Sequence, residues 1–149
     1  MNERYETFTV AISKISRCIR KIKTVEMEEF NLKSPHVSCL YYLYKNDGEL
    51  TAKELCDICD EDKASISRSI EFLETNGYIT CNSKTEKRYK SPLILTQLGQ
   101  QIGSKIAQKI DNILEPASIG LTNQDRETFY KSLLTISNNL QKLCDKYGE

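Results

Sequence analysis

Residues 50–96 decide the fold, and they read LTAKELCDICDEDKASISRSIEFLETNGYITCNSKTEKRYKSPLILT. Two short helical patterns are followed by a turn, an extended run, a charged tip and a second extended run. A helix-turn-helix with a two-stranded ribbon behind it suits duplex DNA, because a helix fits the major groove while the ribbon tip reaches the neighbouring backbone. We therefore expect a mainly α-helical fold with a small β-wing.

The two helices of this stretch carry clear boundary signals. Thr51 and Glu54 form a capping box, in which each side chain satisfies a backbone N–H at the start of the first helix. Asp62 is the expected N-cap of the second helix, and Asn76-Gly77 is its expected end. The acidic run 60–62 is therefore interpreted as helix-start chemistry rather than as evidence against DNA binding.

The outer face of the second helix is predicted to be polar, with Lys63, Ser65, Ser67, Arg68 and Ser69 on it. Serine can bond to phosphates or base edges without bulk, and arginine can grip guanine through two hydrogen bonds. The same pattern also fits a solvated helix face with no ligand, so this helix alone does not decide between the two interpretations.

Two extended runs, 78–81 and 91–95, are predicted to form the wing, with residues 82–90 as its tip. Pro92 favours an edge position for the second strand, because proline cannot donate to a ladder. The tip carries Lys84, Lys87, Arg88 and Lys90. A charged loop is usually only solvated, but a basic tip directly after a helix-turn-helix favours phosphate contacts.

Both ends of the chain carry long apolar stripes. Tyr5, Phe8, Ile12, Ile15, Ile19 and Ile22 recur at steps of three and four, as do Phe129, Leu133, Ile136, Leu140 and Leu143. Such narrow seams indicate partner helices, and two of them suit a two-fold dimer better than pairing within one chain. Between the stripes, Ser34 is the expected N-cap of a helix with Pro35 at its first position, and a helix from residue 97 is expected to end before Pro116.

The composition narrows the class of protein. Lysine plus arginine equals aspartate plus glutamate at 21 each, so the chain is no broad nucleic-acid coat and any positive charge is local. No apolar run is long enough for a membrane span and no export signal opens the chain, which predicts a cytoplasmic protein. We find no catalytic constellation and no phosphate-cradling glycine loop, so we expect neither an enzyme nor a cofactor.

The six cysteines are expected to be reduced thiols in such a protein. Cys56 and Cys59 form a single CxxC, but no second CxxC exists and the sole histidine, His36, is distant in sequence. A structural zinc site is therefore disfavoured, and burial as small hydrophobic residues explains the cysteines better. His36 is expected to be a surface or packing residue, with ligand sensing as the alternative.

The ordered segments LTAKEL (50–55), DKASISRSIEFLETNGYI (62–79) and PLILTQLGQQI (92–102) resemble the MarR family of bacterial dimeric winged-helix transcription factors. The resemblance covers essentially the whole chain and implies one domain, 1–149, with a winged-helix core at 34–96. It further implies that segments 1–30 and 97–147 are dimerisation helices. Its expected function is a regulator, and more specifically a repressor, that binds a pseudo-palindromic operator as a homodimer.

The resemblance also assigns roles to residues. Ser65, Ser67 and Arg68 match positions of the recognition helix that face bases or phosphates, and Thr51 and Lys53 match the backbone-contacting start of the preceding helix. In the wing, Arg88 is the preferred contact, and a register shifted by one residue would instead place Lys87 where the family has an aspartate.

Regulation is the other property that the resemblance implies. Family members commonly respond to a small aromatic effector between the dimer helices and the DNA-binding lobe, and others sense oxidants through a cysteine near the start of the chain. Cys18 and His36 are therefore the candidate sensors, with a Cys56–Cys59 sensor as a further alternative. The competing function is a winged-helix module for protein association without DNA binding.

Overall fold

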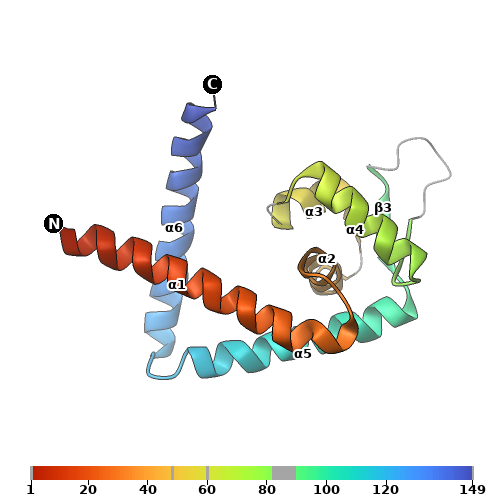
Figure 1. The fold of residues 1–149 in the computed structure, drawn as a ribbon, viewed down its shortest axis with the longest axis horizontal. Coiled ribbons are helices and arrows are strands. Elements are labelled where there is room, and N and C mark those ends of the chain that lie inside the picture. The colour runs from red at the N-terminus through yellow and green to blue at the C-terminus, as the bar shows by residue number, and fades with distance from the viewer. Residues whose placement is uncertain (1, 48, 60, 82–89, 149) are drawn as a thin grey trace. The chain divides into compact units, whose positions relative to one another are not determined.

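The computed structural model describes residues 2–47, 49–59, 61–81 and 90–148. The elements in chain order are α1 (Asn2–Met27), the short 3-10 helix η1 (Glu28–Phe30), α2 (Ser34–Lys45), β1 (Leu50–Thr51), α3 (Ala52–Cys59), α4 (Lys63–Thr75), β2 (Ile79–Cys81), β3 (Pro92–Leu95), α5 (Gln97–Ala117) and α6 (Asn123–Tyr147) (Figure 1). The chain divides into two compact units, Met1–Ile110 and Asp111–Glu149. The mainly α-helical fold with a small antiparallel sheet confirms the predicted fold class.

The sheet differs from the expectation in its strand order. Its order is β1-β3-β2, and both pairings are antiparallel, so β3 is the central strand rather than an edge. Pro92 is compatible with this place because it is the first residue of its strand, where a missing N–H is tolerated. The prediction was wrong because β1 has only two residues, Leu50 and Thr51, too few to produce a strand pattern in the sequence.

One apolar core holds the first unit together, and α2, α3 and α4 surround it (Figure 1). Fully buried leucines and isoleucines from these helices meet residues of the sheet; the largest are Leu40, Leu43, Leu55, Ile66, Leu73, Ile79 and Leu93. Each such side chain contributes about 1.5–3 kcal/mol by leaving water. Burial of Ile66, Ile70 and Leu73 fixes which face of α4 is left to solvent.

The His36 ring caps the start of α2, where the sequence predicted Ser34 as the cap. Lys33 is the N-cap residue, and its backbone N–H donates to Nδ1 of His36 at 3.2 Å. The His36 ring also stacks on Phe72 of α4, with ring centroids 4.0 Å apart and planes 3° from parallel. His36 is thus a buried packing residue that joins the start of α2 to α4, and Ser34 is the first helical residue instead of the cap.

Hydrogen bonds join Thr96, directly before α5, to Gly77 and Tyr78, which follow α4. The Thr96 hydroxyl donates to the carbonyls of Gly77 and Tyr78 at 2.6 and 3.1 Å, and it accepts from the Gly99 N–H at 3.1 Å. A Cβ on Gly99 would lie 2.0 Å from the Tyr78 carbonyl oxygen, so this close approach requires glycine. At its other end α5 runs one residue past Pro116, contrary to the expectation, because a proline in the last turn interrupts few helix bonds.

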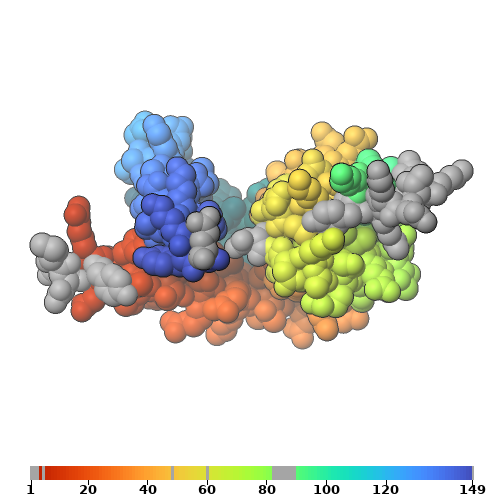
Figure 2. Space-filling model, turned by 90° about the horizontal axis from the view of Figure 1, so that it is seen from above, coloured from red at the N-terminus to blue at the C-terminus, as the bar shows by residue number. Residues whose placement is uncertain are grey.

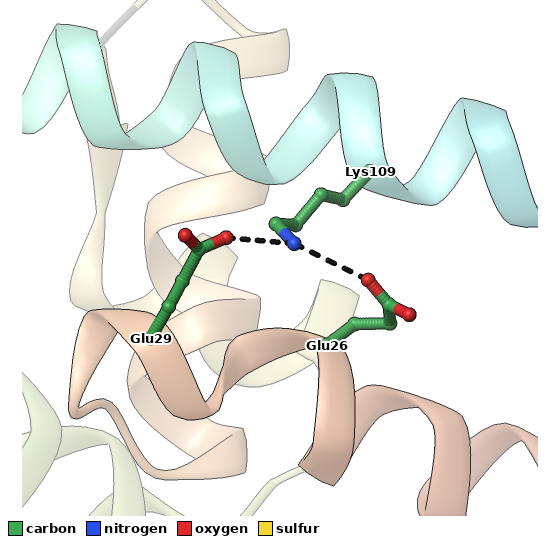
Figure 3. A network of polar contacts seen from close by, with 3 residues as sticks. All are labelled: Glu26, Glu29 and Lys109. Carbon is green, nitrogen blue, oxygen red and sulfur yellow. Dashed lines mark hydrogen bonds and ion pairs between the residues drawn. The ribbon is translucent and has the colours of Figure 1, made fainter.

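A charged network joins α5 to the end of α1. Lys109 Nζ lies 3.2 Å from Glu26 Oε2 and 2.6 Å from Glu29 Oε1 (Figure 3). The ammonium also lies 5.9 Å from the centre of the Phe30 ring. These carboxylates raise the pKa of Lys109 above its ordinary value, because they stabilise its charged form.

The apolar stripes at the two ends of the chain are largely exposed within one chain. On α1, Phe8, Ile12, Ile15, Ile19 and Ile22 are each exposed by 38–58%. On α6, which begins with a Thr122–Asp125 capping box, Phe129, Ile136, Leu140 and Leu143 are exposed by 39–49%. Neither helix is apolar enough to cross a membrane, and the same holds for every other helix in the described part of the chain.

Candidate nucleic-acid interface

The helix-turn-helix is built from α3 and α4, and local hydrogen bonds set where each helix begins. The Thr51 N–H and hydroxyl donate to Glu54 Oε2 at 2.8 and 2.9 Å, while the Glu54 N–H donates back to the Thr51 hydroxyl at 3.2 Å. These bonds hold the pKa of Glu54 below its ordinary value. Asp62 Oδ1 accepts from the Ser65 N–H at 2.7 Å. Both predicted caps are confirmed.

Four of the predicted contact residues lie on α4. Lys63, Ser67 and Arg68 are exposed, and Ser65 is partly buried. Ser69 is buried with only 2% of its surface exposed, so its placement on the outer face was wrong. It lies three residues after Ile66 and four before Leu73, and this spacing puts all three on the core side of the helix.

Thr51 and Lys53 lie together at the start of α3, but their side chains are placed differently. Lys53 is exposed, whereas Thr51 is partly buried at the junction of β1 and α3. The Thr51 hydroxyl proton is engaged by Glu54. A phosphate accepts hydrogen bonds, so Thr51 offers it no hydroxyl donor in this arrangement, and its role is to fix the start of the helix that carries Lys53.

The wing arms are β2 and β3, which pair with Cys81 opposite Leu93. Lys84, Lys87 and Arg88 lie outside the described residues. Lys90, two residues before the second arm begins, is exposed.

A recess that the sequence did not predict lies beside the exposed face of α4. Its volume is about 360 Å³, and its walls come from Ala52, Lys63, Ile66, Ser67, Ile70, Glu71 and Leu93. Lys63, Ser67 and Glu71 line it at steps of four residues, so this side of α4 faces the central strand. Arg68 does not line the recess. Lys63, Ser67 and Glu71 therefore lie on the side of α4 that faces β3, whereas Arg68 lies outside the recess. The sequence alone did not distinguish these two groups of α4 side chains.

The candidate sensors occupy contrasting places. Cys18 is exposed on α1, whereas His36 is buried and its Nδ1 already accepts the Lys33 N–H. A second cavity of about 270 Å³ lies between the end of α1 and the start of α2, lined by Lys23, Thr24, Met27, Leu32, Lys33, Ser34 and Val37. Within the described ranges, no group of three or more His, Cys, Asp or Glu side chains could hold a metal ion.

Comparison with known proteins agrees with this architecture. A family model described as MarR family matches residues 30–88. The chain is 23% identical over 131 residues to the uncharacterized HTH-type transcriptional regulator YybA of Bacillus subtilis, a match that covers 88% of this chain and 87% of that protein. It is 28% identical over 118 residues to YwoH of the same organism, with 79% and 85% covered.

Solved structures show the same fold. A MarR family transcriptional regulator from Listeria monocytogenes, complexed with 26mer DNA, superposes with a TM-score of 0.78 at 26% identity and covers 89% of this chain and 87% of its own. A MarR family regulator from Neisseria meningitidis has a TM-score of 0.80 at 16% identity, with 96% and 97% covered, and this likeness concerns the fold alone. The family consists of transcriptional regulators rather than enzymes. The family model over residues 30–88 and the likeness to these structures support a MarR-family winged-helix transcriptional regulator.

Proposed function

We propose that the chain binds duplex DNA as a homodimer and regulates transcription from a pseudo-palindromic operator, as a repressor. The observation that carries the proposal is the exposed face of α4, where Ser67 and Arg68 stand on a helix whose opposite face is fixed in the core. The Listeria relative complexed with DNA supports it. Figure 2 shows the surfaces of α3 and α4, in yellow to yellow-green, next to one another on one lobe.

Each predicted contact residue has a part in this proposal. Arg68 and Ser67 read base edges, with Lys63 and Ser65 at the start of the same helix beside them. Lys53 binds the backbone, and Thr51 holds the start of its helix. The wing residues Lys84, Lys87, Arg88 and Lys90 contact phosphates, with Arg88 as the principal wing contact.

The test is a salt titration of binding to the chain's own promoter DNA. Each lost phosphate contact lowers the slope of log affinity against log salt by about 0.9. We expect Lys53→Ala and the double replacement of Lys87 and Arg88 by alanine to flatten the slope, whereas Arg68→Ala should weaken specific binding by about 1–3 kcal/mol and relax preference at one base pair.

Lys105→Ala is the matched control, because Lys105 is an exposed lysine on α5 rather than on α3 or α4. Its slope should equal that of the unchanged protein. Equal slopes for all variants would refute the interface. They would favour the competing function, a protein-association module, for which the equal numbers of acidic and basic residues are the main argument.

The homodimer is proposed from the two exposed stripes. Segments 1–30 and 97–147 serve as dimerisation helices around the core 34–96, because α1 and α6 each expose a line of large apolar side chains that a partner can cover. In a dimer, two copies of α4 about 34 Å apart can read the two halves of a palindrome, so each chain needs to supply one recognition helix.

A small aromatic effector is proposed for the cavity of about 270 Å³ between α1 and α2, where Lys23 and Lys33 offer positive charge to a carboxylate or phenolate. The protein acts in the cytoplasm, where its promoter lies. Titration of simple aromatic acids against the intrinsic tyrosine fluorescence tests the effector. Saturable binding that Lys33→Ala abolishes is the expected result, and identical curves for both proteins would exclude this cavity.

A further inference from the structure

The exposed face of α4 carries an acidic side chain among the residues proposed to read DNA. Glu71 is exposed and borders the same recess as Ser67. Successive residues of an α-helix are about 100° apart, so Glu71 lies about 40° from Ser67 and about 60° from Arg68 around the helix axis. A helix that turns Ser67 and Arg68 toward DNA therefore turns Glu71 toward it as well.

The carboxylate of Glu71 has no structural task within the described part of the chain. No ion pair among those residues involves Glu71 or its neighbour Arg68, although side chains three positions apart on a helix can pair. Asp62 caps the start of α4, and the buried residues of the helix form its core face, so Glu71 serves in neither place. Its carboxylate is therefore left to contact whatever binds this face of α4.

An ionised carboxylate is selective toward DNA because it only accepts hydrogen bonds. Phosphate oxygens, guanine O6 and N7, and thymine O4 are also acceptors, so a carboxylate placed against them is repelled. The donors in the major groove are cytosine N4–H and adenine N6–H, and the adenine donor has the acceptor N7 beside it. Cytosine is thus the base that the Glu71 side chain fits best.

We propose that Glu71 is a specificity-determining residue that accepts a hydrogen bond from cytosine N4, next to the base pair that Arg68 reads. The two residues are three positions apart, which is about 4.5 Å along α4, and neighbouring base pairs are about 3.4 Å apart. The two opposite charges therefore fit adjacent base pairs, with Arg68 on guanine and Glu71 on cytosine. This inference rests on the proposed function, because it requires α4 to enter the major groove.

Short side chains before Glu71 permit the close approach that this contact needs. Ser67 lies one turn and Ala64 two turns toward the start of α4, and both are exposed. They share a face with Glu71, because steps of three and four residues return to the same side of a helix. Small residues at both positions let the helix backbone lie close to the groove floor, so the Glu71 side chain can reach a base edge.

Selection from a library of random duplexes tests the assignment with the full chain. The unchanged protein and Glu71→Gln each enrich the duplexes that they bind, and every base pair of an enriched half-site is then varied while affinity is measured by fluorescence anisotropy. For the unchanged protein, replacing one cytosine should weaken binding about tenfold, the effect of one good base contact. With Glu71→Gln the preference at that base pair should change from cytosine to adenine, because an amide both donates and accepts.

Glu115→Gln is the matched control, because it removes the same charge from an exposed glutamate of α5. Its base preferences should equal those of the unchanged protein. If Glu71 only repelled phosphates, Glu71→Gln would raise affinity for all duplexes alike and keep every base preference, and that result would overturn the role assigned to Glu71 while leaving the proposed function intact. A failure of the unchanged protein to enrich any duplex would instead refute the proposed function, and this inference with it.

Discussion

At Gly99, α5 closely approaches Tyr78 and Leu95, and Gly99→Ala tests that junction. The added Cβ would stand 2.0 Å from the Tyr78 carbonyl oxygen and 3.0 Å from Leu95 Cδ2. Ordinary contact begins at 3.4 Å, so the backbone must separate by 1.4 Å from that oxygen. The same oxygen accepts the Thr96 N–H at 3.0 Å and the Thr96 hydroxyl at 3.1 Å, and neither bond survives such a displacement.

The expected cost follows from three effects. Each lost hydrogen bond costs about 1 kcal/mol, and overpacking a close contact adds about 1–3 kcal/mol. Alanine in place of glycine within a helix returns about 1 kcal/mol. The free energy of unfolding should therefore fall by about 2–4 kcal/mol, a large part of the ~5–15 kcal/mol that holds a typical domain.

Urea unfolding followed by circular dichroism at one fixed protein concentration measures this change. Gln100→Ala is the control, because Gln100 is exposed and its backbone bond to Thr96 is retained. The control should stay within about 0.5 kcal/mol of the unchanged protein. A Gly99→Ala protein that unfolds at the same urea concentration as the control would show that α5 is not held against Tyr78.

Three further outcomes are expected. Asp62→Ala should lower the free energy of unfolding by about 1 kcal/mol, and Asp62→Ser should restore most of it, because serine also caps α4; equal losses in both urea titrations would contradict the cap. Burial, with the charge of Lys33, lowers the pKa of His36 below 6.5, so the unfolded chain binds this proton first and stability should fall as the pH drops from 7 toward 5. His36→Gln should remove that slope, since the chain has one histidine, and a persisting slope would exclude His36 as its source. Ile19→Glu should shift sedimentation toward a single chain, and an unchanged dimer would place the contact elsewhere than on this stripe.

Local chemistry made part of the fold predictable from the sequence. The Thr51–Glu54 and Thr122–Asp125 boxes and the Asp62 cap each depend on groups three residues apart, so neighbouring residues contain the whole interaction. Most of the exposed face of α4 was predictable for the same reason, because its period is local, but Ser69 was placed on that face and is buried. Arg68 and Ser67 are exposed as this period requires, and Lys53 is exposed on α3.

The errors arose where distant segments decide the outcome. The central place of β3 depends on Leu50 and Thr51, which lie about forty residues earlier and pair with Leu93 and Pro92. The cap of α2 depends on the His36 ring, which Phe72 of another helix holds in position.

Helix α5 contacts both the end of α1 and the residues that follow α4. Near its start, α5 is fastened through Thr96 to the carbonyls of Gly77 and Tyr78, directly after α4. Thirteen residues later, Lys109 pairs with Glu26 and Glu29 beside the end of α1. A rise of about 1.5 Å per residue separates these attachments by roughly 20 Å along a single helix. The same helix therefore contacts both the end of α1 and the residues that directly follow α4.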